Sequence, residues 1–183
     1  MRRVVLLPVA VAALAAACSS GTEPRPTTAN LLADSADQVM FGVSTTITSD
    51  GVLRARLAAD TAYFFDGSTR VEVRNERTTF YTTVGEQSAV LTSREGTYNM
   101  QRGMMQARRA VVVVTTDGKR LETPELNYNQ QTDLITSDSA FVLTQPSGQL
   151  RGIGFTSDPD LTKVHVKRVL TGGGTITLPE TRP

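Results

Sequence analysis

The segment from residue 117 to residue 143 constrains the fold most, because its apolar and polar side chains alternate with a period of two. Asp117-Gly118 opens it with a hairpin signal, and polar runs separate the apolar stretches that follow. Period-two alternation is typical of strands and fits no amphipathic helix here. The segment therefore predicts three short strands joined by turns, with these side chains in one layer: Leu121, Thr123, Leu126 and Tyr128.

A looser copy of this segment lies upstream. Leu91 and Tyr98 have the same spacing as Leu121 and Tyr128, and an apolar run follows each pair. A third, more degenerate copy begins at Leu57. Matching turn positions in the copies favour a structural repeat of hairpins.

The rest of the chain from Phe41 also alternates like strands. Asn75-Glu76-Arg77 is expected to turn the chain between two of them. Residues 111–114 are four valines, apolar on both faces, and such a strand is usually covered on both sides. Short strands joined by short polar turns predict an all-β sandwich, roll or solenoid.

The N-terminus has the physical features of an export signal. Arg2 and Arg3 precede an apolar run that is too short to span a bilayer, and small residues then lead to Cys18. This pattern resembles the lipobox of bacterial lipoproteins, in which the cysteine is acylated after cleavage. Cys18 is the one cysteine in the chain, so no internal disulfide is expected. The alternatives are an ordinary signal peptide or a short anchor helix with an incidental cysteine.

Charge excludes some classes of partner. The whole chain has a formal net charge of +1, which becomes −1 once Arg2 and Arg3 are removed with residues 1–17. This balance provides no basic surface for nucleic acid. Residues 18–39 are rich in Ser, Thr and Pro at their start and predict a flexible tether between lipid and domain.

No motif predicts catalysis. The single histidine, His165, alternates with valines on the polar side of a strand, and no nucleophile or acid is placed beside it by a motif. Asp158-Pro159-Asp160 lacks the further carboxylates that a calcium loop needs, so a plain turn is expected. We expect no enzyme activity, no metal and no cofactor.

Three stretches resemble the LptC family, the inner-membrane-side component of the lipopolysaccharide transport bridge. Residues 51–59 with Tyr63 resemble the first strand pair of that family. The segment from Leu121 to Tyr128 resembles a unit shared with OstA-type bridge proteins, and residues 150–155 resemble a late Gly-x-Gly-Phe strand. The resemblance covers about Met40 to Leu170.

The resemblance implies a slanted, open β-jellyroll, or β-taco, of two facing antiparallel sheets. Lipopolysaccharide acyl chains would lie between the sheets, where each buried methylene contributes ~0.8 kcal/mol. It implies a domain at residues 40–170. The glycine-rich residues that follow predict a flexible tail at residues 171–183. The residues expected to line the lipid groove are Leu53, Leu57, Val71, Val73, Phe80, Leu91, Tyr98, Val112, Val114, Leu126, Tyr128, Phe141, Leu143 and Phe155.

The resemblance also implies partners at both ends of the domain. LptF and LptG, with the LptB ATPase, would meet the N-terminal edge, and LptA would meet the C-terminal edge. Residues expected at a partner edge are Gly152, Gly154, Val164 and Val166.

Localisation has two interpretations. Acylated Cys18 would anchor the protein to the inner membrane, whereas Ser19 beside it favours the outer membrane by the enterobacterial sorting rule. The alternative function is a structural or adhesive outer-membrane lipoprotein with a fully packed β domain.

Overall fold

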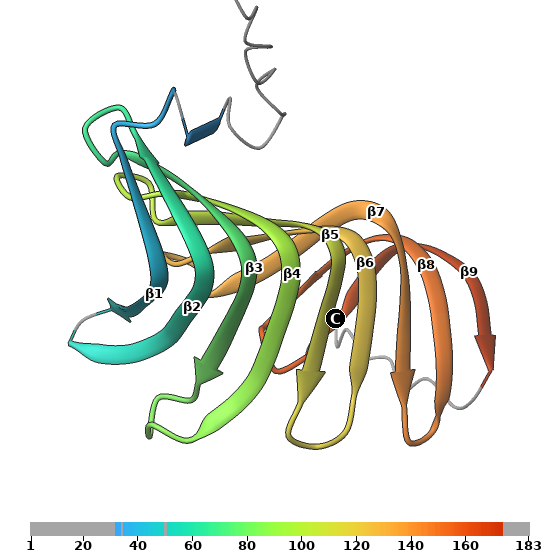
Figure 1. The fold of residues 1–183 in the computed structure, drawn as a ribbon. Helices are drawn as coiled ribbons and strands as arrows, with labels where there is room; N and C mark the ends of the chain where they lie inside the picture. The colour runs from blue at the N-terminus through green and yellow to red at the C-terminus, as the bar shows by residue number, and fades with distance from the viewer. Residues whose placement is uncertain (1–31, 34, 50, 174–183) are drawn as a thin grey trace, which may run out of the picture.

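The computed structural model describes residues 32–33, 35–49 and 51–173. In this part of the chain, nine antiparallel strands form one sheet, and each strand pairs with its neighbours in the sequence (Figure 1). The sheet is open, because β1 and β9 lie at opposite ends of the strand order. The strands are β1 (Gln38–Ser49), β2 (Val52–Phe65), β3 (Arg70–Tyr81), β4 (Gln87–Asn99), β5 (Met104–Thr115), β6 (Arg120–Asn129), β7 (Leu134–Gln145), β8 (Gly148–Ser157) and β9 (His165–Gly173).

A line of interrupted pairing crosses the sheet, and we call it the fold line. The strand ladders skip residues there, and several of these residues have positive φ, as at Asn75 (51°) and Gly154 (70°). Irregular residues of this kind act like β-bulges, which bend a strand and change the face on which its side chains lie. The residues on the fold line are Gly42, Asp60, Asn75, Arg94, Arg109, Ala110, Pro124, Asp138, Ser139, Gly154 and Lys167.

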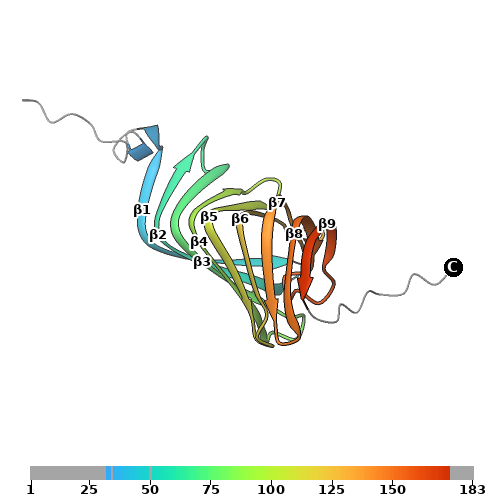
Figure 2. The same cartoon turned by 90° about the vertical axis from the view of Figure 1, so that its right-hand side faces the viewer.

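The fold line divides every strand into two halves, which form two arms. The strands curve along their length, so the sheet folds over on itself (Figures 1 and 2). The expected all-β taco is thus confirmed, with one continuous sheet supplying both layers. The first arm contains residues 43–49, 52–59, 76–81, 87–93, 111–115, 120–123, 140–145, 148–153 and 168–173; the second contains residues 38–41, 61–65, 70–74, 95–99, 104–108, 125–129, 134–137, 155–157 and 165–166.

The repeated leucine and tyrosine positions occupy equivalent places in the sheet. Leu91 and Leu121 lie at one level, because both pair with Val113. Tyr98 and Tyr128 likewise both pair with Met105, at a level in the second arm. Each repeat therefore crosses the fold line once.

The third copy departs from this pattern. Leu57 is in register with Leu91, because both residues pair with Thr78 of β3. Tyr63, however, pairs with Glu72, and its neighbour Phe64 occupies the level of Tyr98. The Leu57-to-Tyr63 spacing is six residues, one fewer than in the other two copies. The leucine and the tyrosine of this copy therefore cannot both occupy the equivalent places in the sheet.

Three expectations about local structure are wrong. The segment from residue 117 to residue 143 contains two strands and not three, because β7 runs unbroken from Leu134 to Gln145 and the fold line only bends it at Asp138. Glu76 and its neighbours do not form a turn; they lie inside β3, where Asn75 marks the fold line. The four valines of β5 are not covered on both faces, since Val113 is 1% exposed whereas Val114 is 41% exposed. One face of a folded sheet packs against the other arm, and the opposite face meets solvent.

The predicted signal peptide, Cys18, Ser19 and residues 18–31 of the predicted tether lie outside the described residues. At the other end of the predicted domain, strand β9 continues through Gly173. Among the residues that the structure describes, no helix is long and apolar enough to cross a membrane.

Candidate functional site

The candidate site is the apolar interior between the two arms. Phe80 of the first arm contacts Tyr128 of the second edge to face, with ring centroids 5.1 Å apart. Phe141 and Phe155 make a similar contact across the fold line at 5.0 Å. Each large apolar side chain removed from water contributes about 1.5–3 kcal/mol, so the inner face holds the arms together.

Most of the predicted groove residues lie on this inner face. Tyr98 is half-buried and packs against the core, and Leu53 is half-buried near the β1–β2 turn. The structure places these predicted residues together in the buried core: Leu57, Val71, Val73, Phe80, Leu91, Leu126, Tyr128, Phe141, Leu143 and Phe155.

Val112 and Val114 lie apart from the other predicted groove residues. They project from the outer face of β5, while Val111 and Val113 occupy the interior. Val112 lines a shallow outer-face groove of about 590 Å³ with Pro124 and other residues of β6 to β9. Side chains alternate across a strand, so choosing the wrong phase inverts every residue of that strand.

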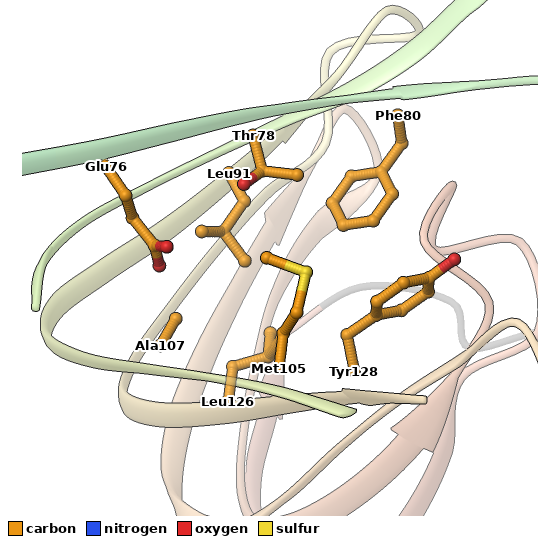
Figure 3. Close-up of a pocket in the computed structure, with 8 residues that line it drawn as sticks. All are labelled: Glu76, Thr78, Phe80, Leu91, Met105, Ala107, Leu126 and Tyr128. Carbon is orange, nitrogen blue, oxygen red and sulfur yellow. The ribbon is translucent and has the colours of Figure 1, made fainter. Parts of the chain in front are cut away.

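The interior contains a polar group that the sequence did not reveal. Glu76 and Thr78 of β3 border a small cavity of about 10 Å³ that is otherwise lined by apolar side chains and Tyr128 (Figure 3). In this view the side chains of β3 point toward those of β5 and β6 from the opposite arm. The first-arm half of β3 thus faces the second-arm halves of β5 and β6. The two layers are therefore offset along the strand order, and this offset makes the taco slanted.

Glu76 is an acid held away from water. It is 3% exposed, and this burial raises its pKa from 4.5 to about 7, opposed in part by a hydrogen bond with Ser93. Ser93 Oγ lies 2.7 Å from Glu76 Oε1 and 2.8 Å from the carbonyl oxygen of Glu95. One hydroxyl proton cannot serve both acceptors fully, so a protonated Glu76 that donates to Ser93 satisfies all three groups.

A glycine makes room for this acid. A Cβ atom on Gly96 would lie 2.3 Å from Glu76 Oε2 and 2.7 Å from Val73 Cγ2. Gly96 pairs with Val73 in the sheet and lies on the same inner face. The absence of a side chain at this position therefore allows the carboxyl group to lie in the interior.

Polar contacts join the arms at their rim. Arg54 of β2 forms an ion pair with Asp133 in the β6–β7 turn, and Tyr128 Oη donates to the same carboxylate at 3.0 Å. In the same turn, Gln130 Nε2 donates to the carbonyl oxygen of Thr48 at 2.7 Å. We call these contacts the rim clasp; they link residues of β1 and β2 to the β6–β7 turn.

The predicted edge residues fall on two strands. Gly152 and Gly154 belong to β8, which pairs with both β7 and β9 and is therefore not an edge. Val166 lies in β9, the last strand of the sheet, and Val164 immediately precedes it. Both outermost strands expose apolar side chains: Met40 and Phe41 on β1, Val169 and Leu170 on β9.

The described residues contain no cluster of three or more His, Cys, Asp or Glu side chains that could hold a metal ion. In the loop after β8, the carboxylate of Asp158 accepts hydrogen bonds from the backbone of Thr162 and Lys163. These contacts fit the turn that the sequence predicts there.

An open antiparallel sheet folded around an aliphatic interior defines this chain as a β-taco protein. The family model described as "Lipopolysaccharide-assembly, LptC-related" matches residues 5–172. The chain therefore belongs to the LptC family, as the three stretches predicted, and has a role in lipopolysaccharide transport in the cell envelope. A comparison with curated proteins gives no match.

Proposed function

We propose that this protein is a non-catalytic carrier that binds lipopolysaccharide between its arms and passes it along the trans-envelope bridge. The observation that carries the proposal is the continuous apolar inner face, which runs along the sheet from Ile47 of β1 to Phe155 of β8. Aliphatic walls provide affinity for acyl chains with little directional preference. That property suits a surface along which a ligand moves.

The two outermost strands support a chain of β domains. An edge strand presents unpaired backbone groups, to which another strand can add. We propose that β1, where Phe41 is 80% exposed, meets the periplasmic domains of LptF and LptG, which work with the LptB ATPase. We propose that LptA joins β9, next to Val166.

We propose residues 1–17 as a lipoprotein signal and Cys18 as the acylated anchor. The proposed site of action is the periplasmic side of the inner membrane, since a carrier that receives lipid from a transporter must lie beside it. Ser19 makes the outer membrane the competing location.

Site-specific photocrosslinking tests the proposal. A photoreactive phenylalanine analogue replaces an aromatic side chain of the inner face, at Tyr98 or Phe141, in cells that produce lipopolysaccharide. Adducts with lipopolysaccharide are expected from both positions. Val90 and Val114, on the outer face of neighbouring strands, are the matched controls and should give none. Equal silence at the inner and outer positions would refute the proposal.

A second function has one observation in its favour. The interior cavity is only about 10 Å³, so the arms are packed against each other. A structural or adhesive outer-membrane lipoprotein would use such a packed domain without binding lipid inside. It predicts no adducts at Tyr98 or Phe141 and no co-purification with transporter subunits.

A further inference from the structure

We propose that Glu76 and Thr78 form a hydrogen-bonding site inside the groove that recognises a hydroxyl group carried on an acyl chain. The inference rests on the proposed function, because it assumes that lipid chains enter between the arms. It adds a chemical preference to a surface that would otherwise accept any aliphatic chain.

Thr78 provides the first observation. Its side chain is 0% exposed, and its Oγ1 has no hydrogen-bond partner among the described residues. The strand neighbours that pair with it, Leu57 and Leu91, offer only apolar side chains. A buried hydroxyl is normally paired, so an unpaired one beside a cavity indicates a polar partner that enters the cavity.

Glu76 provides the second observation. It lies two residues before Thr78 on the same inner face of β3, so both polar groups border one cavity (Figure 3). Gly96 leaves space for its carboxyl group, because a side chain there would place its Cβ only 2.3 Å from Oε2. The sheet thus positions a carboxyl and a hydroxyl side by side in an apolar wall.

The cavity selects the class of ligand group. Its other lining residues are apolar except for Tyr128, whose hydroxyl donates to Asp133 at the rim. A phosphate would find no positively charged side chain among the lining residues, and a cation would find only one carboxyl group. A neutral hydroxyl can donate to the carboxyl group and accept from Thr78, and about 10 Å³ suits one oxygen atom.

A single buried water molecule is the competing occupant, because a polar cavity of this size can hold one. The arms must separate before a lipid chain reaches Thr78. A hydroxyl on that chain would then replace the hydrogen bonds of the water. A chain without a hydroxyl would leave Thr78 unpaired.

Matched fatty acids test the inference. The chain from residue 18 onward, carrying Cys18→Ser, is titrated with tetradecanoic acid and with monohydroxytetradecanoic acids that differ in hydroxyl position. At least one hydroxy acid is expected to bind about 10-fold more tightly than the unsubstituted acid. Thr78→Val should abolish this ratio, and Thr78→Ser should retain it. If the valine variant does not fold, Thr78→Ala serves the same comparison.

Ser88→Ala is the control. Ser88 Oγ is also buried and unpaired in the described structure, but it lies in a separate cavity at the rim and not beside Thr78. This variant should keep the preference for the hydroxy acid. Equal binding of all the acids, or a preference that survives Thr78→Val, would overturn the inference and leave a water site only, with the proposed lipid groove intact. Failure of every acid to bind, together with absent lipopolysaccharide adducts, would overturn the proposed function itself.

Discussion

Arg54 forms an ion pair with Asp133, although the two residues are 79 positions apart in the chain. The pair joins β2 of the first arm to the turn that ends β6 in the second. It lies beside the Gln130 to Thr48 hydrogen bond, so the arms are fastened at the rim as well as by the core. A lipid that enters from the rim must first break these contacts, and the rim clasp is therefore expected to control access to the interior.

Arg54→Met should weaken this clasp. The side chains of Arg54 and Asp133 are 17% and 36% exposed, so the pair is partly shielded from solvent. Its loss should lower the free energy of unfolding by roughly 1 kcal/mol. It should also speed the uptake of a fluorescent fatty acid, because separation of the arms becomes easier. Urea denaturation and stopped-flow fluorescence measure the two effects.

The control for Arg54→Met is Arg120→Met. Arg120 pairs with Glu122 at 3.0 Å on the outer face of β6, where both side chains are 48% exposed. Exposed pairs of this kind contribute little, so stability should change by less than about 0.5 kcal/mol and uptake should be unaltered. Equal uptake rates in the two variants would show that the clasp does not limit entry.

Adjacent valines of β5 test the assignment of faces. Val113→Asp places a carboxylate in the core, where an unpaired charge is costly, and should lower stability by several kcal/mol. Val114→Asp places the same group on the outer face and should have a small effect. Thermal unfolding followed by circular dichroism distinguishes them. A similar loss in both variants would mean that the outer face of β5 is also covered.

Gly96→Ala should be destabilising although the backbone at this position suits any residue. The new methyl group would overlap the Glu76 carboxyl and Val73, and such overpacking typically costs about 1–3 kcal/mol. A double-mutant cycle with Glu76→Ala isolates the contact. The combined loss should be smaller than the sum of the single losses, since the alanine at position 76 removes one of the two clashes. Strict additivity would contradict the proposed geometry.

Sequence patterning predicted the strands well because one buried face imposes a period of two. It could not locate the fold line, where residues as different as Asn75 and Pro124 interrupt pairing without a shared motif. It also missed Glu76, because a polar run within a strand looks like a solvated turn. The sequence could not predict which valines of β5 point into the core, since four identical residues fit either face. Long-range contacts such as Arg54 with Asp133 leave no local signal.

The pKa of Glu76 predicts how stability varies with pH. Its pKa is raised from 4.5 to about 7 in the folded protein, so between these values the folded state holds a proton that the unfolded state has released. The contribution of Glu76 to stability is therefore greatest below its unfolded pKa and falls as pH rises toward 7, by on the order of 3 kcal/mol in total. Glu76→Gln cannot ionise, and its amide can still donate to Ser93, so this fall should be absent. Urea denaturation at several pH values between 4.5 and 8 compares the two proteins. Parallel curves would mean that Glu76 gains water or a counter-charge when it ionises.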